Sequence, residues 1–440
     1  MLGFAALSGI ALHGYATVSR DITGGNTTTG SGFTLSTNTI ILFAICLGIA
    51  LVFGYGYVML ARTFPKVFIW ATGILNIAFA IGTAIYYFYH HFWGAAIIFL
   101  IFGLLVMWFF WSCRHRIPFT ALLLQTSVNV ARRYGHVWLL SFFGGIIAIA
   151  MAAWFAVTLV AIWVRWQPNS NGQCLGGQTD CSNATAVGLT VFASFAIFWM
   201  TEWLKNTLHT TAAGVYGSWY YMVHVFPHDA TRGALKRSLT YSFGSISLGS
   251  LIVAIINLLR QLCQVARSQN AASGDWLAWA LFCVAECLLG ILDWIVQFIN
   301  RYAFVHVALY GKSYIASARD TWRMIKDRGF DALINDCLIW PVLTYGAIFI
   351  GYCCALVAYV YLLITRPSYN QDGSYTAFIV AFTFLIGTQI CNVFTAPIAS
   401  GIETIFVAAA WDPDVLMRDH RDLYDEMIRV YPRVQEAIHA

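Results

Sequence analysis

Long runs of apolar residues, each nearly free of charge, constrain the fold of this sequence more than any other feature. A helix needs about twenty apolar residues to cross the hydrocarbon core of a bilayer. Ten runs approach or exceed that length, at residues 1–18, 39–61, 67–88, 93–112, 137–163, 185–208, 239–263, 276–299, 333–364 and 375–408. The alternating ten-residue strands of an outer-membrane barrel are not seen. The sequence therefore predicts an all-α polytopic membrane protein with about ten transmembrane helices.

The composition supports this prediction. Only 10% of the 440 residues are charged and 59% are hydrophobic, whereas soluble domains carry about 25% charged residues. Such a surface must be solvated mainly by a lipid bilayer, which excludes a soluble enzyme, a nucleic-acid-binding domain and a disordered scaffold. The net charge of +5 is too small to indicate a polyanionic partner.

The distribution of basic residues predicts the orientation. With the N-terminus inside, all but five of the 25 Lys and Arg residues fall on the inner side of the ten spans; the five are Arg20, Arg165, Arg260, Arg267 and Arg366. This bias is typical of cytoplasmic loops. We therefore predict that both termini are cytoplasmic, with a transporter domain over residues 1–410 and a cytoplasmic tail over 411–440.

The first span could be mistaken for a secretory signal. It lacks the basic segment that such signals carry, so a retained transmembrane helix is favoured. Its abrupt start predicts that a polar cytoplasmic tail precedes it.

Two predicted outer loops contain features of extracellular chemistry. Asn26 and Asn183 each begin a glycosylation sequon. Cys174 and Cys181 share the second loop, in a Gly- and Asn-rich stretch that could close into a disulfide. We predict that both asparagines are glycosylated and that the two cysteines are bridged.

Polar residues within the spans are the candidates for function, because a charge at membrane depth costs about 2.5–3.5 kcal/mol on insertion scales. Helical spacing places them on stripes along three spans. The candidates are Trp199, Glu202, Trp203, Asn206 and His209 in the sixth span, Trp279, Glu286, Asp293 and Trp294 in the eighth, and Gln389, Asn392 and Glu403 in the tenth. Pro397 interrupts the tenth span, which is common beside binding cavities.

We expect Glu202 and Glu286 to face a shared, partly hydrated cavity that sets the charge of a transport pathway. Glu286 has no basic residue near it in the sequence, so it would need water, a substrate cation or a proton as partner. Structural roles remain possible: Glu202 could pair with Lys205 one turn away, and Trp and Tyr near span ends usually form interfacial belts.

Catalytic motifs are missing. The chain contains no phosphate-binding lysine loop, no CxxC pair and no nucleophile elbow, and no His, Cys and carboxylate spacing indicates a metal. No enzyme activity, cofactor or metal is predicted.

Residues 301–328 contain six basic residues between two apolar spans. Basic residues gain about 1 kcal/mol each beside anionic lipid. We expect an amphipathic segment against the inner leaflet there.

Several blocks resemble the signature of the choline transporter-like proteins over about residues 190–412. They are TEW at 201–203, HTTAAGVYGSWYY at 209–221, GSISLGSLI at 244–252, NRYAF at 300–304 and YGKSY at 310–314. The large first outer loop of animal members is missing, since only about twenty residues separate the first two spans. In this the chain resembles the fungal plasma-membrane branch of the family.

The resemblance implies a multi-pass plasma-membrane carrier of choline or a related small organic cation, working by alternating access. A quaternary ammonium ion needs aromatic faces and negative charge, and Trp199, Trp203, Trp279 and Trp294 share helices with the carboxylates. Two other classes remain open: a channel or lipid scramblase, and a structural or regulatory membrane protein that transports nothing.

Overall fold

The computed structural model describes residues 2–23, 37–112, 114–134, 136–166, 183–223, 227, 229–328, 331–365 and 376–430. Over these residues all regular elements are helices, as predicted. They group into two compact units that interleave along the chain. The first unit takes residues 1–30, 143–210 and 235–318, and the second takes 31–142, 211–234 and 319–440.

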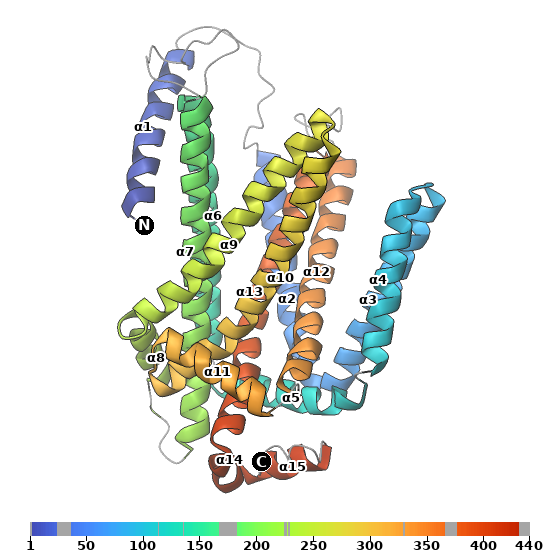
Figure 1. Cartoon of the computed structure of the whole chain (residues 1–440), viewed down its shortest axis with the longest axis vertical. Coiled ribbons are helices and arrows are strands. Elements are labelled where there is room, and N and C mark those ends of the chain that lie inside the picture. Colours follow the sequence, from blue (N-terminus) through green and yellow to red (C-terminus); the bar gives the residue numbers. More distant parts are fainter. Residues whose placement is uncertain are drawn as a thin grey trace. The chain divides into compact units, whose positions relative to one another are not determined.

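The first unit is built from three complete long helices, α1, α9 and α10, and from parts of four others. Its helices are α1 (Leu2–Thr23), α6 (His136–Trp166) from residue 143, α7 (Asn183–Tyr221) to residue 210, α8 (Ala230–Leu239) from residue 235, α9 (Phe243–Ser273), α10 (Trp276–Tyr310) and the first turn of α11 (Tyr314–Arg328). Helices α9 and α10 form a hairpin (Figure 1). Gly274, at φ 78°, ends α9 in a left-handed conformation that glycine adopts at little cost, and Asp275 caps α10 by accepting from the N–H of Ala278.

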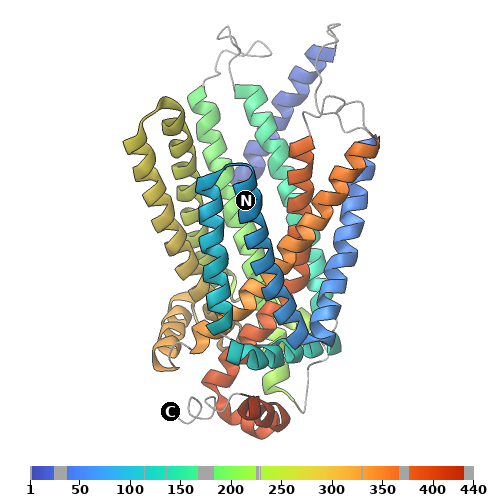
Figure 2. The same cartoon turned by 90° about the vertical axis from the view of Figure 1, so that its right-hand side faces the viewer.

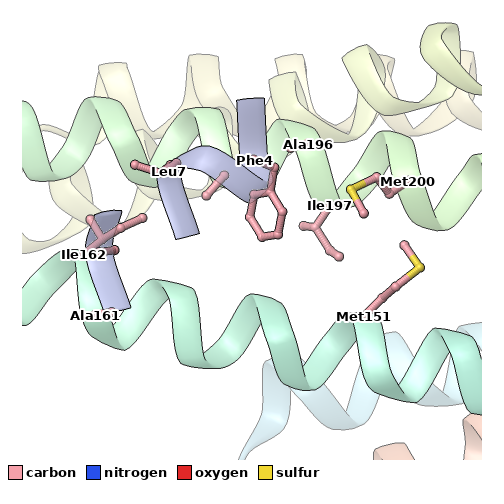
Figure 3. Close-up of a cluster of buried hydrophobic side chains, with 10 residues drawn as sticks. Phe4, Leu7, Met151, Ala161, Ile162, Ala196, Ile197 and Met200 are labelled. Atoms are coloured by element: carbon pink, nitrogen blue, oxygen red, sulfur yellow. The ribbon is translucent and has the colours of Figure 1, made fainter. Parts of the chain in front are cut away.

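Helix α1 packs into this unit along α6 and α7. Phe4 and Leu7 are buried among a set of apolar side chains from those helices (Figure 3). The hydroxyl of Ser8 accepts hydrogen bonds from Trp154 and Thr158 at 2.7 and 3.0 Å. This packing favours the interpretation of the first span as a helix of the bundle.

The second unit combines long helices with shorter ones that are not apolar enough to cross a membrane. Its helices are α2 (Thr37–Thr63), α3 (Pro65–Tyr89), α4 (Trp93–Ser112), η1 (Arg114–Arg116), α5 (Ile117–Arg133), α12 (Asp331–Thr365), α13 (Thr376–Trp411), α14 (Pro413–Asp419) and α15 (Arg421–Val430), with the remaining parts of α6, α7, α8 and α11. Helices α12 and α13 approach closely because Gly351 and Gly387 face each other: a Cβ on Gly351 would lie 2.9 Å from the carbonyl oxygen of Phe384.

Helix α5 is the longest of the helices that the sequence analysis did not predict. It turns by 85° from α4 and runs crosswise to α3 and α4 (Figures 1 and 2). One face of it is buried, including Leu123 and Ser127. An amphipathic helix of this length gives no twenty-residue apolar run, so a search for spans passes over it.

Each of the ten predicted spans falls on a helix, although not all of these helices are long and apolar enough over their described residues to cross a membrane. Over the described residues, seven helices are long and apolar enough to cross a membrane, or up to eight if α4 and α5 form one bent span. The described apolar stretches of α1 and α6 are shorter, at Leu2–His13 and His136–Met151. The chain is a polytopic all-α membrane protein.

Candidate functional site

The polar stripe of α7 is bonded to its neighbours in the first unit. The indole N–H of Trp199 donates to the carbonyl of Ser247 at 3.1 Å, and the amide of Asn206 donates to the hydroxyl of Ser250 at 2.9 Å. His209 Nε2 lies 3.0 Å from the carbonyl oxygen of Arg301. These three predicted site residues therefore fix α7 against α9 and α10.

A second set of bonds, which the sequence analysis missed, joins the end of α10 to α9 and α11. Asn300 is buried; it donates to the carbonyl of Gly249 at 3.3 Å and accepts from the Tyr314 hydroxyl at 2.5 Å. The N–H of Tyr314 donates to the hydroxyl of Ser245 at 3.2 Å. Burial raises the pKa of the Tyr314 phenol, so it remains a hydroxyl donor at neutral pH. We call Asn206, Ser245, Gly249, Ser250, Asn300 and Tyr314 the polar junction.

Gly249 lets the polar junction close. A Cβ on this residue would lie 2.6 Å from the rings of both Phe304 and Tyr314. The small-residue block at 244–252 thus serves close helix packing at Gly249.

Two further candidate residues of α7, Glu202 and Trp203, also have partners within the first unit. Glu202 has Lys205 at 3.4 Å, which is the structural alternative considered for it from the sequence. Trp203 packs against Phe243 with ring centroids 5.7 Å apart and borders a small core formed by Ile246, Phe304 and Tyr314. A role of Glu202 and Trp203 in a transport pathway stays a prediction.

The expectation that Glu286 lacks a basic partner is wrong. Arg267 on α9 places Nη1 2.8 Å from one carboxylate oxygen, and Gln264 donates to the other at 2.9 Å. The sequence did not reveal this pair because the two residues are 19 positions apart and meet only where the α9–α10 hairpin folds back on itself.

Asp293 is also paired across the hairpin. Arg260 lies 3.3 Å from its carboxylate, and Gln297 donates to it at 2.9 Å. The sequence analysis counted Arg260 and Arg267 on the outer side and ended the seventh span at residue 263, whereas both residues belong to α9 within the candidate span Phe243–Ala271. Two ion pairs, Arg267–Glu286 and Arg260–Asp293, therefore join α9 to α10 along the hairpin.

The two candidate tryptophans of α10 lie on its exposed surface. Trp279 is 44% and Trp294 50% exposed. Trp294 stacks on Phe298, one turn along the same helix. In this position the two side chains contact the surroundings of the hairpin, and in a membrane protein these surroundings include lipid.

The stripe on α13 contrasts with those on α7 and α10. Gln389 and Asn392 are exposed, and Glu403 is buried at 4% exposure. At 1.5 Å per residue, Gln389 lies about 15 Å and Asn392 about 20 Å along the candidate span that begins at Ile379. The three residues share one helical face, since 14 residues make nearly four whole turns. We call Gln389, Asn392 and Glu403 the α13 stripe.

The opposite face of α13 is held tightly in the second unit. The Ser127 hydroxyl donates to the carbonyl of Ile398 at 2.9 Å, and the Tyr216 hydroxyl donates to the carbonyl of Ser127 at 3.0 Å. A Cβ on Gly401 would lie 2.2 Å from the Tyr216 ring. Helix α13 is thus clamped beside Pro397, which lacks an N–H and leaves a carbonyl of the preceding turn without its helical donor.

Some predictions remain outside these observations. Asn26, Cys174 and Cys181 lie outside the described residues, and Asn183 begins α7 with an undescribed side chain. Glycosylation and the disulfide therefore stay predictions. Within the described part of the chain, no group of three or more His, Cys, Asp or Glu residues could hold a metal ion.

Comparisons with known proteins give the chain relatives over its whole length. A sequence profile described as plasma-membrane choline transporter matches residues 97–414. The chain is 58% identical to Protein PNS1 of Gibberella zeae, over 99% of the chain and 81% of that protein. It is 56% identical to Protein PNS1 of Neurospora crassa, over 100% and 79%, and 41% identical to that of Yarrowia lipolytica, over 99% and 77%. These matches confirm the resemblance found in the sequence blocks.

Proposed function

Because the chain belongs to the plasma-membrane choline transporter family, we propose that it carries choline or a related small organic cation across the plasma membrane by alternating access. Membership of a transporter family makes the chain a membrane transporter in general and points away from an enzyme. The identity of the substrate is part of the proposal, because the name Protein PNS1 of the fungal relatives states no substrate.

The α13 stripe is the observation that supports the proposal most. Two exposed amides far inside an apolar span would be costly against lipid. Lining a water-filled pathway removes that cost, and amide and carboxylate oxygens suit a cation. The interrupted helix at Pro397 fits such a site, because broken helices are common where transporters bind substrate.

The hydrogen bonds on the opposite face of α13 hold this helix in place, so that it can form one wall of the proposed pathway. The bonds from Ser127 and Tyr216 hold the turn after Pro397 in place. The two exposed stripe residues, Gln389 and Asn392, can then meet a substrate without the helix rotating. In this proposal Glu403 supplies the negative charge, and Gln389 and Asn392 supply oriented oxygens.

Uptake into proteoliposomes tests the proposal. We expect saturable uptake of choline or another amine from a panel, driven inward by a negative interior potential. Glu403→Gln keeps the side-chain volume and removes the charge, so transport should fall about tenfold or more while folding survives, in line with about 1.5–3 kcal/mol for a hydrogen bond to a charged group. Asp425→Asn, an exposed carboxylate on α15, is the matched control. Flux that does not saturate, or lipid flipping, would favour a conduit instead.

A further inference from the structure

Helix α11 is fixed at a membrane boundary by its place in the chain. Helix α10, whose whole length passes as a candidate span, ends at Tyr310, and α11 begins at Tyr314 (Figure 1). Three connecting residues reach about 10 Å at most. The next candidate span, Val342–Thr365, follows α11. Only 15 residues long and rich in charge, α11 cannot itself cross a bilayer.

One face of α11 is buried. Tyr314, Ser317, Thr321 and Met324 are each less than 9% exposed and follow helical spacing. The bonds of Tyr314 to Asn300 and Ser245 attach the first turn to the polar junction. The structure therefore corrects the sequence expectation for residues 301–328: the part up to Tyr310 continues α10, and only α11 is the amphipathic segment.

The opposite face of α11 carries two large apolar side chains among three cations. Ile315 is 63% and Trp322 59% exposed. Arg319, Arg323 and Lys326 are exposed as well. Positions 315, 319, 322, 323 and 326 fall within about one third of the helix circumference at 100° per residue. Exposed apolar and basic residues therefore share a single surface, which we call the α11 outer face.

We propose that the α11 outer face binds the headgroup region of an anionic phospholipid leaflet. Trp and Ile suit the boundary between headgroups and acyl chains, and Lys and Arg attract anionic lipid. Asp320 pairs with Arg323 at 3.8 Å and lies off this face. The outer face is therefore basic, and its charge is complementary to that of the lipid. The boundary position of α11 brings the two within reach of each other.

Site-specific crosslinking of the full chain in proteoliposomes tests this contact. A benzoyl-phenylalanine probe replaces Ile315 or Trp322, in vesicles of phosphatidylcholine alone or of phosphatidylcholine with phosphatidylserine. We expect lipid adducts at both positions, severalfold more abundant with phosphatidylserine. Because each basic residue contributes about fivefold to binding at an anionic surface, Arg319→Gln with Lys326→Gln should reduce the adduct to the level seen in phosphatidylcholine.

Two further probe positions calibrate the measurement. Trp108 on α4 is 70% exposed in an apolar helix, so a probe there should capture lipid equally in both vesicles. A probe at Asp425 on α15 should capture little lipid. Equal adduct yields in the two vesicle types at positions 315 and 322 would overturn the proposal, as would crosslinks to a second protein chain in place of lipid.

Discussion

The polar junction of the first unit and the α13 stripe of the second both contain side-chain amides within apolar helices, but these amides have different surroundings. In the junction, Asn206, Asn300 and Tyr314 each bond to a neighbouring helix and are buried. On α13, Gln389 and Asn392 are exposed. A polar side chain inside a span can therefore either fix a helix interface or remain available to solvent and substrate. The difference separates structural from functional candidates better than polarity alone.

The largest effect should come from breaking the junction. Asn300→Ala leaves the Tyr314 hydroxyl and the Gly249 carbonyl without this partner, and each unsatisfied buried group costs about 1–3 kcal/mol. We expect a loss of about 2–4 kcal/mol in stability, measured as a lower midpoint of thermal unfolding in detergent. Asn392→Ala, the matched change on the α13 stripe, should shift stability by less than about 0.5 kcal/mol. Equal shifts in the two variants would remove the distinction.

The same α13 substitution should reverse the ranking when transport is measured. Asn392→Ala should lower kcat/KM for uptake about tenfold, about 1.4 kcal/mol, if its amide contacts the substrate or the water of the pathway. Initial rates in proteoliposomes, corrected for the amount of inserted protein, give this value. Ser268→Ala, at an exposed position of α9, serves as the control. An unchanged rate for Asn392→Ala would place the pathway elsewhere.

The ion pairs of the α9–α10 hairpin should have a smaller effect. Glu286→Gln removes the pair with Arg267, whose side chain is 40% exposed and lies six residues before the end of α9. Its guanidinium can then reach the interface, so we expect about 1 kcal/mol of destabilisation and transport within about twofold of the parent.

The double variant with Arg267→Gln sharpens this test. If the pair is structural, removing both charges should recover part of the stability lost in Glu286→Gln. A collapse of transport in Glu286→Gln with normal stability would instead return Glu286 to the pathway, as the sequence analysis expected.

The smallest effect concerns the segment after α13 and its response to pH. Its His420 donates from Nε2 to the carbonyl of Tyr220 at 3.0 Å and lies against Trp219, with ring centroids 4.4 Å apart. Burial lowers the pKa of His420 below its usual 6.5, although the bond to Tyr220 and the charge of Asp419 oppose the shift. The neutral imidazole therefore stabilises the docked segment fully above about pH 6.5, and this contribution is lost as the pH falls through the lowered pKa.

Hydrogen exchange of residues 413–430 checks this pH dependence. Amides in α14 and α15 should exchange faster at pH 5.5 than expected from intrinsic rates, and His420→Asn should abolish the difference. Amides of the polar junction provide the internal reference. Identical pH dependence in the two regions would contradict the role of His420.

The sequence determined the class of protein and most of its helices, because apolar run length depends on the bilayer alone and needs no knowledge of neighbours. The family was also readable there, from blocks such as HTTAAGVYGSWYY at 209–221. Helix α5 escaped because one of its faces is buried by protein, which no run of apolar residues reveals. Tyr216, quoted only as part of a family block, gained a role when the structure placed its hydroxyl on Ser127.

The partners of the polar residues were decided only by the tertiary structure. Helical spacing correctly placed Glu286 and Asp293 on one stripe of α10, but a stripe shows only which residues share a face. The hairpin turn at Gly274 sets the register in which Arg267 and Arg260 meet those carboxylates, and burial distinguishes Asn300 from Asn392. Charge pairing and burial act between segments distant in the chain, so their outcome depends on packing that local sequence does not encode.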